Sequence, residues 1–477
     1  MWITNNLINS IKNMKTRFLI VIILFLLQVS CAKFVEIEVP DYKIISKTVF
    51  SSDETAERAV LGIYNELAKA DFSNGDFSSV TTLSELSADN FNTTTLNYSM
   101  IEFEQNNISP NNSYNLNLWS SAYKIIYMCN AVLEGLEFSE GISSESRTKF
   151  SGEAKFVRAF AYFYLVNLYG EVPIVLTTDY RKNAVLHKSS IEDVYGFIIN
   201  DLNDASTVLG NNYIAGERIR ASRFTAMALL ARVYLFLEDW EMAEVLSNEL
   251  IESSENYTLL KNLDEVFLAN SKEAIWQISP AGRGPLSFIT NEARIFILNS
   301  PPPNSQKPVA LSDDFLNSFN EEDRRLVQWI GNYNTGNQVF HYPYKYKVNS
   351  SSVIEEYSMV LRLAEQYLIR AEARAYQDRL SAAITDLNKI RERAQLPSIS
   401  SSTSSISRES VLDSIQIERR RELFTEWGHR WLDLKRTGMA LSPWISLNSN
   451  IDNSDLLYPI PDQEIIKNPN LIQNEGY

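Results

Sequence analysis

The sequence of 477 residues predicts a mostly α-helical fold in which an irregular, loop-rich lobe interrupts a scaffold of helices. The segment from Phe156 to Tyr169 is apolar or aromatic almost throughout, which is typical of a helix packed on all its sides. Other segments repeat apolar residues at helical spacing, which indicates amphipathic helices. Residues 261–360 instead contain prolines, glycines and short aromatic alternations, which predict loops and short strands.

The apolar segment is predicted to form the central helix of the core, within residues 152–169. We expect it to end at Gly170, because glycine readily adopts the left-handed conformation that stops a helix. Pro173 follows shortly after and pushes Val172 into an extended conformation. Residues 174–176 should then continue as a short buried run.

Amphipathic helices are predicted at residues 53–70, 118–136 and 191–209. Ser190 is expected to cap the third of these, with Asp193 three residues further on. Residues 72–117 are rich in Asn, Ser and Thr and predict a long loop.

Two helical hairpins are predicted at residues 222–253 and 361–394. In each hairpin two alanines lie twelve residues apart across the turn, which lets antiparallel helices approach closely. The first hairpin resembles the tetratricopeptide pattern, whereas in the second Arg374 replaces the tyrosine of that pattern. Two ordinary helical hairpins are the alternative. The alanine pairs are Ala231 with Ala243 and Ala371 with Ala383.

The helical scaffold is therefore assigned to residues 50–260 and 361–440, with the irregular lobe at about 261–360. Near its end, residues 411–435 carry many charges, and Glu426 and Arg430 have the four-residue spacing that is attractive in a helix. One interpretation of this segment is a solvated charged face backed by Leu423, Phe424, Trp427 and Trp431.

The N-terminus has the pattern of a secretory signal peptide, covering residues 1–30. Its ten apolar residues from Phe18 to Leu27 follow basic residues and are too few to span a bilayer, which needs about 20. Met14 begins a more typical signal than Met1 does, so we expect translation to start at Met14.

Cys31 is the predicted site of a lipid anchor. Val29-Ser30-Cys31 resembles the end of a bacterial lipobox, in which the thiol is diacylated and the chain is cut before it. Gln28 departs from the usual leucine, and ordinary cleavage near Ala32 is the alternative. Residues 31–49 are then a lipidated tether. With Cys31 acylated, Cys129 has no disulfide partner and is expected to be a small buried hydrophobe.

Composition excludes some classes of function. The net charge of -15 repels nucleic-acid phosphate, so we expect no nucleic-acid partner. The 23 Tyr, 23 Phe and 8 Trp suit a helical core and equally suit stacking on sugar rings. The three histidines, His187, His341 and His429, are scattered, which argues against a His-based metal site.

The motifs of common enzymes are missing: there is no Gly-x-Ser-x-Gly, no His-Glu-x-x-His and no phosphate loop. We therefore expect a binding protein with no catalytic residue, no metal and no cofactor. The 59 acidic residues always offer carboxylate pairs of the kind that glycosidases use, so that alternative stays open.

Three stretches resemble the signatures of the SusD/RagB family, surface lipoproteins that deliver nutrients to outer-membrane transporters in Bacteroidetes-type bacteria. The first is residues 152–176, with Arg-Ala-Phe, Leu-Tyr-Gly and Val-Pro in order. The second is Glu-Arg-Arg-Arg-Glu-Leu at 418–423, followed by Gly-His-Arg-Trp and Asp-Leu-Lys-Arg. The third is the tail from Tyr458-Pro459-Ile460-Pro461 to Tyr477.

This resemblance implies a single SusD-like domain over residues 50–477, an α–α superhelix of four tetratricopeptide-like helix pairs with a lobe that faces the ligand. It also implies an outer-membrane location facing the cell exterior, held by lipid on Cys31. The implied partner is a SusC-like TonB-dependent barrel, to which a captured glycan is handed without bond making. RagB-like capture of oligopeptides and a scaffold without ligand are the alternatives.

Aromatic and polar residues of the two irregular stretches are the candidates for holding the ligand, because sugars lay apolar faces on rings while polar groups fix their hydroxyls. Peptides also bury side chains on aromatic surfaces, so residue type alone does not choose the ligand. Trp119 lies in a predicted helix and is expected in the core. The candidates are Asp76, Phe77, Phe91, Asn92, Tyr98, Phe288, Arg294, Trp329 and Tyr333.

Overall fold

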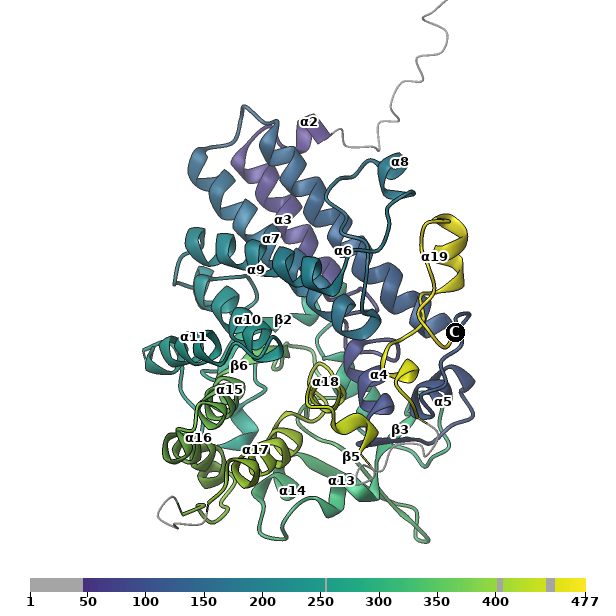
Figure 1. Cartoon of the computed structure of the whole chain (residues 1–477), viewed down its shortest axis with the longest axis vertical. Coiled ribbons are helices and arrows are strands. Elements are labelled where there is room, and N and C mark those ends of the chain that lie inside the picture. The colour runs from purple at the N-terminus through teal and green to yellow at the C-terminus, as the bar shows by residue number, and fades with distance from the viewer. Residues whose placement is uncertain (1–45, 254, 401–405, 443–450) are drawn as a thin grey trace, which may run out of the picture. The chain divides into compact units, whose positions relative to one another are not determined.

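A computed structural model of the chain describes residues 46–253, 255–400, 406–442 and 451–477 (Figure 1). The chain divides into two units, residues 1–49 and 50–477, and the fold below is that of the second. The first unit contains α2 (Ser46–Val49). The predicted signal peptide, Cys31 and most of the tether lie outside the described residues. Within the described part, no helix is both long and apolar enough to cross a membrane.

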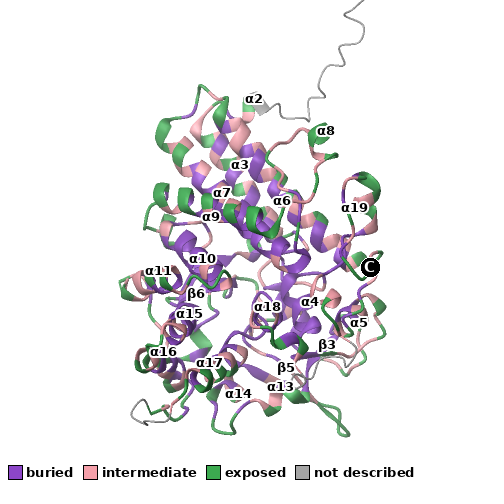
Figure 2. Ribbon diagram, viewed as in Figure 1, coloured by how far each residue is buried: buried purple, intermediate pink, exposed green. Residues whose placement is uncertain are grey.

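Three long helices of the N-terminal half pack around a fourth, α7 (Ser144–Tyr169), as Figure 1 shows. Every residue of α7 from Phe156 to Tyr169 except Asn167 is buried, so the prediction of a central helix is confirmed (Figure 2). Gly170 ends the helix with a φ of 73°, as predicted. The other three helices are α3 (Asp53–Leu67), α6 (Ser113–Glu137) and α9 (Ile191–Val208).

One buried arginine ties three of these helices together. Arg158 of α7 donates two hydrogen bonds of 2.8 and 2.9 Å to Asp201 of α9, and one of 2.7 Å to Asn130 of α6. Cys129, the neighbour of Asn130, is fully buried as predicted, and burial raises the pKa of its thiol. The predicted cap of α9 is also present, since Ser190 accepts a hydrogen bond from the backbone N–H of Asp193.

The two predicted hairpins are present and pack against each other, although about 140 residues separate them in sequence. Trp240 of the first stacks on Tyr376 of the second, with ring centroids 3.9 Å apart. All four predicted alanines are fully buried, which permits the close approach of each helix pair. The helices are α10 (Arg223–Phe236), α11 (Trp240–Glu252), α15 (Leu363–Tyr376) and α16 (Leu380–Arg393).

The prediction of one long loop over residues 72–117 is wrong. This stretch holds α4 (Val80–Ser87), β1 (Phe91–Thr93) and α5 (Tyr98–Glu104) before α6 begins. All eight residues of α4 are buried, including its serines and threonines, so it lacks the apolar stripe by which a helix is recognised in sequence. Ser79 caps it by accepting a hydrogen bond from the N–H of Thr82.

The irregular lobe contains short strands, as predicted, and also short helices, which were not predicted. Its strands form three two-stranded antiparallel sheets, β1–β3, β2–β6 and β4–β5, so the first of these joins the lobe to the stretch before α6. The strands are β2 (Ala274–Ile278), β3 (Val309–Leu311), β4 (Ile330–Asn334), β5 (Val339–Pro343) and β6 (Ser358–Arg362). Short helices include α12 (Asn291–Phe296), α13 (Asp313–Asn317) and α14 (Arg324–Gln328).

The charged C-terminal segment is buried, so its interpretation as a solvated face is wrong. It forms α17 (Arg408–Leu423) and α18 (His429–Arg436), separated by a turn in which Thr425, Trp427 and Gly428 all have positive φ. The predicted pair of Glu426 with Arg430 does not form. Glu426 instead accepts hydrogen bonds from Arg362 at 2.7 and 2.8 Å.

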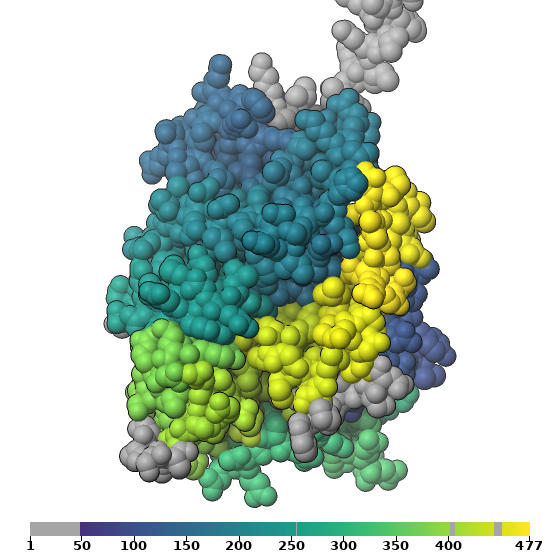
Figure 3. Space-filling model, viewed as in Figure 1, coloured from purple at the N-terminus to yellow at the C-terminus, as the bar shows by residue number. Residues whose placement is uncertain are grey.

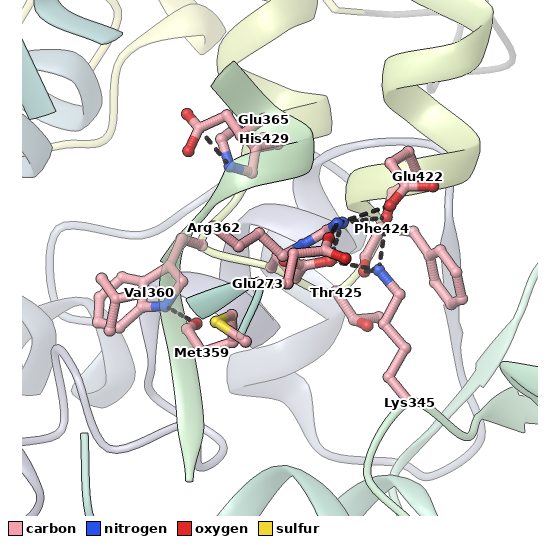
Figure 4. A network of polar contacts seen from close by, with 12 residues as sticks. Glu273, Lys345, Met359, Val360, Arg362, Glu365, Glu422, Phe424, Thr425 and His429 are labelled. Carbon is pink, nitrogen blue, oxygen red and sulfur yellow. Dashed lines mark hydrogen bonds and ion pairs between the residues drawn. The ribbon is translucent and has the colours of Figure 1, made fainter. Parts of the chain in front are cut away.

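Glu422 is the centre of this buried network (Figure 4). It accepts hydrogen bonds from Arg362 at 2.6 Å and from Arg325 at 3.1 Å, and it also pairs with Arg393. Burial disfavours the charged carboxylate, but these guanidinium groups hold its pKa well below the usual range. Because a buried charge is costly without a partner, the network fixes the relative positions of α15, α17 and the lobe.

The C-terminal tail lies along the N-terminal helices, as the yellow segment in Figure 3 shows. The backbone N–H of Tyr458 donates to the carbonyl of Leu168 at 2.7 Å, and Asn474 donates to the carbonyl of Tyr169 at 2.9 Å. The tail also contains the short helix α19 (Asp462–Lys467).

Candidate functional site

A cavity of about 700 Å³ opens between the β1–β3 sheet and β5, and we call it the strand groove. It lies where the two irregular stretches meet, since β1 belongs to the first and β3 and β5 to the second. Its lining is Asn92, Thr93, Thr94, Thr95, Leu96, Ile101, Pro302, Pro303, Ala310, Leu311, Asp313, Gln338, Val339, Phe340 and His341.

Two of the candidate ligand residues, Phe91 and Asn92, are neighbours in β1 and differ in burial. Successive side chains of a strand point to opposite faces, so Phe91 and Asn92 face opposite ways. Asn92, paired with Ala310 of β3, is exposed and lines the groove. Phe91 is 2% exposed and packs on Phe296, with ring centroids 5.4 Å apart. The prediction of Phe91 as a ligand residue is therefore wrong.

The three threonines after Asn92 form one wall, and two of them are held by hydrogen bonds. The N–H of Thr93 donates to Glu104 at 3.1 Å, and Thr94 donates to the carbonyls of Lys307 and Pro308. Thr95 differs, because its buried hydroxyl has no hydrogen-bond partner among the described residues. Buried polar groups are rarely left unpaired, so this hydroxyl marks a place where a bound polar molecule is favoured.

The opposite wall is β5, with the partly exposed ring of Phe340 and the side chains of Gln338 and His341. Tyr333 of β4 pairs directly with Phe340. Directly opposed residues of an antiparallel pair point to the same face, so the candidate Tyr333 lies beside a lining ring. The candidate Tyr98 begins α5, the helix that contributes Ile101 to the lining, and is 76% exposed.

Three candidates come together in a second place. Asp76 and Arg294 form an ion pair, and the Arg294 guanidinium lies 6.0 Å from the centre of the Phe77 ring. All three side chains are partly exposed. None of them lines the strand groove, so the structure divides the predicted site between two clusters.

Trp329 is fully buried, so its prediction as a ligand residue is wrong. Its indole N–H donates to the carbonyl of Leu263 at 3.1 Å, and the Lys345 ammonium lies 4.8 Å from its ring. The Trp329 ring therefore packs against cationic side chains of the buried charge network. Phe288 is partly exposed but does not line the strand groove.

Sequence patterns did not identify the threonine wall, Gln338 or the β5 residues Phe340 and His341 as lining residues. A signal for β5 was available, because aromatic residues alternate from Phe340 to Tyr346. The threonines carried no such signal, since runs of Ser, Thr and Asn are typical of loops in general.

The strand groove is suited to binding without covalent chemistry. Its polar groups are hydroxyls, amides, an imidazole and the carboxylate of Asp313, and its apolar surface includes Phe340 and Leu96. Among the described residues, no cluster of three or more His, Cys, Asp or Glu side chains is arranged to hold a metal ion. Concave sites with an apolar wall and a few placed polar groups are typical of small-molecule binding.

Comparison with known proteins identifies the family. The family profile described as "Starch-binding associating with outer membrane" matches residues 36–235, and that of the "SusD family" matches residues 330–477. A SusD-like protein of Formosa agariphila is 26% identical, in an alignment covering 94% of this chain and 97% of that protein.

Solved structures share the fold. A SusD superfamily protein from Bacteroides vulgatus superposes with a TM-score of 0.77 at 21% identity, over 89% of this chain and 99% of that one. The surface glycan-binding protein A from Bacteroides thetaiotaomicron, in complex with laminarihexaose, superposes with a TM-score of 0.74 at 20% identity over 89% and 99%. With two family profiles over both halves, a relative along nearly the whole length and this shared helical fold, the chain belongs to the SusD/RagB family.

Proposed function

We propose that this protein is a surface lipoprotein that captures a glycan in the strand groove and hands it to a SusC-like TonB-dependent transporter. The observation that carries the proposal is the groove itself. Its volume of about 700 Å³ lies within the range of about 300–1,000 Å³ typical of small-ligand sites. The groove also combines the aromatic ring of Phe340 with the hydroxyls of its threonines and the amides of Asn92 and Gln338.

The comparisons support the class of ligand. One matched profile is described as starch-binding, and a protein of the same fold is solved with laminarihexaose bound. A sugar ring in the groove would lay its apolar face on Phe340, with Tyr333 beside it. Asn92 and Gln338 would then form hydrogen bonds with its hydroxyls. Thr95, whose hydroxyl has no partner in the described part of the chain, would gain one.

The anchor and the partner complete the proposal. Acylation of Cys31 would hold the protein at the outer membrane, the membrane that also contains the barrel. The description of the matched profile as associating with the outer membrane supports this location. Delivery then needs capture and release alone, without bond making.

Calorimetric titration of a chain that starts after Cys31 tests the proposal against its alternatives. We expect binding to neutral oligosaccharides, with laminarihexaose and maltohexaose as first probes, and none to a panel of oligopeptides. Binding of peptides alone would favour RagB-like capture. Binding of neither class would favour a scaffold without ligand.

A further inference from the structure

A second groove, of about 260 Å³, lies on the helical scaffold between α6, the segment after α7, α8 (Tyr180–Asn183) and α19. We call it the tyrosine groove. It is separate from the strand groove, since the two share no lining residue. Figure 3 shows α19, in yellow, against the blue surface of the N-terminal helices. The C-terminal tail is attached there by Asn468, which donates to the carbonyl of Leu186 at 2.8 Å.

One wall is a row of aromatic rings on α6. Trp119, Tyr123 and Tyr127 are spaced four residues apart, so they lie along one face of the helix. The Trp119 and Tyr123 rings are 4.9 Å apart. The Tyr123 hydroxyl donates to the carbonyl of Pro173 at 2.9 Å, which fixes that ring. Tyr127 also lines the groove, is 51% exposed and makes no side-chain hydrogen bond to another described residue.

One buried polar group of the lining lacks a hydrogen-bond partner among the described residues. Asn183 donates to the carbonyl of Thr177 at 2.8 Å, but its buried side-chain oxygen has no hydrogen-bond partner among the described residues. The groove therefore offers one unpaired acceptor beside an aromatic wall, and such a group favours an occupant that donates a hydrogen bond.

The charge of the groove is balanced. Glu464 and Lys467 of α19 pair with each other at 2.7 Å on the groove's edge. The remaining lining is uncharged: it consists of Pro173, Val175, Asn183, Ala184, Asn468, Leu471 and the three rings. A neutral ligand is therefore favoured over an ion.

We propose that the tyrosine groove is a second saccharide site that binds one neutral sugar residue. A pyranose has an apolar face to lay on Tyr123 and Tyr127 and has hydroxyls that both donate and accept. One of those hydroxyls can donate to the Asn183 oxygen while the ring face lies on the aromatic wall. The volume of about 260 Å³ limits the occupant to one sugar ring. The proposal takes its class of ligand from the proposed function, but its place is independent of the strand groove.

The test is saturation-transfer NMR on the unlipidated chain from Ala32, with glucose, galactose, mannose and xylose as probes. All measurements use a Phe340→Ala background, which removes a ring of the strand groove. We expect saturation transfer to at least one of these sugars. Tyr127→Ala, and separately Ala184→Trp, which fills the groove from its exposed edge, should each weaken that binding about tenfold or more.

Tyr180→Ala is the matched control, because Tyr180 is 76% exposed on neighbouring α8 but does not line the groove. It should leave the signal unchanged. The absence of transfer to all four sugars would overturn the proposal, as would a signal that survives both Tyr127→Ala and Ala184→Trp. Either result would leave oligosaccharide binding in the strand groove standing, so the two proposals fail separately.

Discussion

Arg430 holds Asp89 through two hydrogen bonds of 2.7 Å, and Asp89 lies two residues before β1 of the strand groove. Burial disfavours the charged carboxylate, yet Arg430 and Arg420 keep the pKa of Asp89 below its usual value. The carbonyl of Asp89 also accepts a hydrogen bond of 2.6 Å from Ser312, which directly follows β3. The second family signature therefore fixes both strands of the β1–β3 sheet.

Arg430→Ala should destabilise the protein by about 3–5 kcal/mol, because it removes the main partner of a buried carboxylate. Urea unfolding of the variant and the wild type measures this difference. Arg58→Ala is the control, since its pair with Glu54 is about three-quarters exposed on both sides and should contribute at most about 1 kcal/mol. Equal effects of the two substitutions would contradict a structural role for the Asp89 pair.

Phe160→Ala should cost about 3–5 kcal/mol by leaving a large cavity in the core. The Phe160 ring is fully buried, with the Trp276 and Trp427 rings 4.9 and 5.0 Å away. Thermal unfolding checks this, with Phe138→Ala as the control because Phe138 is 79% exposed. An unchanged melting temperature for Phe160→Ala would show that the centre of the core is misassigned.

Glu85 should make stability fall as the pH rises. Burial raises its pKa from about 4.5 to about 7, while Asn90 and the N–H of Thr425 donate to it at 2.7 and 2.8 Å. Between those two pH values the folded protein keeps a proton that the unfolded chain has lost. The unfolding free energy therefore falls with rising pH across this window, by about 3 kcal/mol for this group.

Glu85→Gln removes this titration, so wild-type stability measured relative to the variant should decrease from pH 4.5 to pH 8. Urea unfolding at several pH values checks the trend. Glu137→Gln, at the exposed end of α6, is the control and should follow the wild type. A difference between wild type and Glu85→Gln that is constant, or grows with pH, would contradict the assignment.

Cys31→Ala should release the protein from the membrane fraction, because it removes the thiol that carries the lipid in the proposed function. Fractionation of cells that express each form, followed by immunoblotting, measures the distribution. Cys129→Ala is the matched control, since Cys129 is fully buried in α6. The idea fails if the Cys31 variant still sediments with outer membranes.

Patterns in the local sequence correctly predicted the central helix α7 and the two helical hairpins. The all-apolar α7, its stop at Gly170 and the alanine pairs of the hairpins depend on contacts between neighbouring turns or facing helices, which periodicity reports. The C-terminal charges show the limit of such reasoning. Arg430 has a carboxylate four residues before it, but its actual partner is Asp89, which is 341 residues away in sequence.

The strand groove could not be predicted for the same reason. Its sheet pairs Asn92 with Ala310, more than 200 residues apart, and no feature of either segment specifies the other. Trp329 shows the converse error. An aromatic residue in a segment without helical periodicity was taken for a surface group, whereas cationic and apolar neighbours enclose it.

The most direct test of the account is the affinity of Phe340→Ala for the oligosaccharide that the wild type binds, measured by calorimetry on the chain that starts after Cys31. Phe340 is partly exposed in the groove, so its loss should leave the fold intact while removing the proposed stacking surface. We expect the dissociation constant to rise about tenfold or more, with Phe138→Ala unchanged as the control. Wild-type affinity in a correctly folded Phe340→Ala protein would contradict glycan capture in the strand groove.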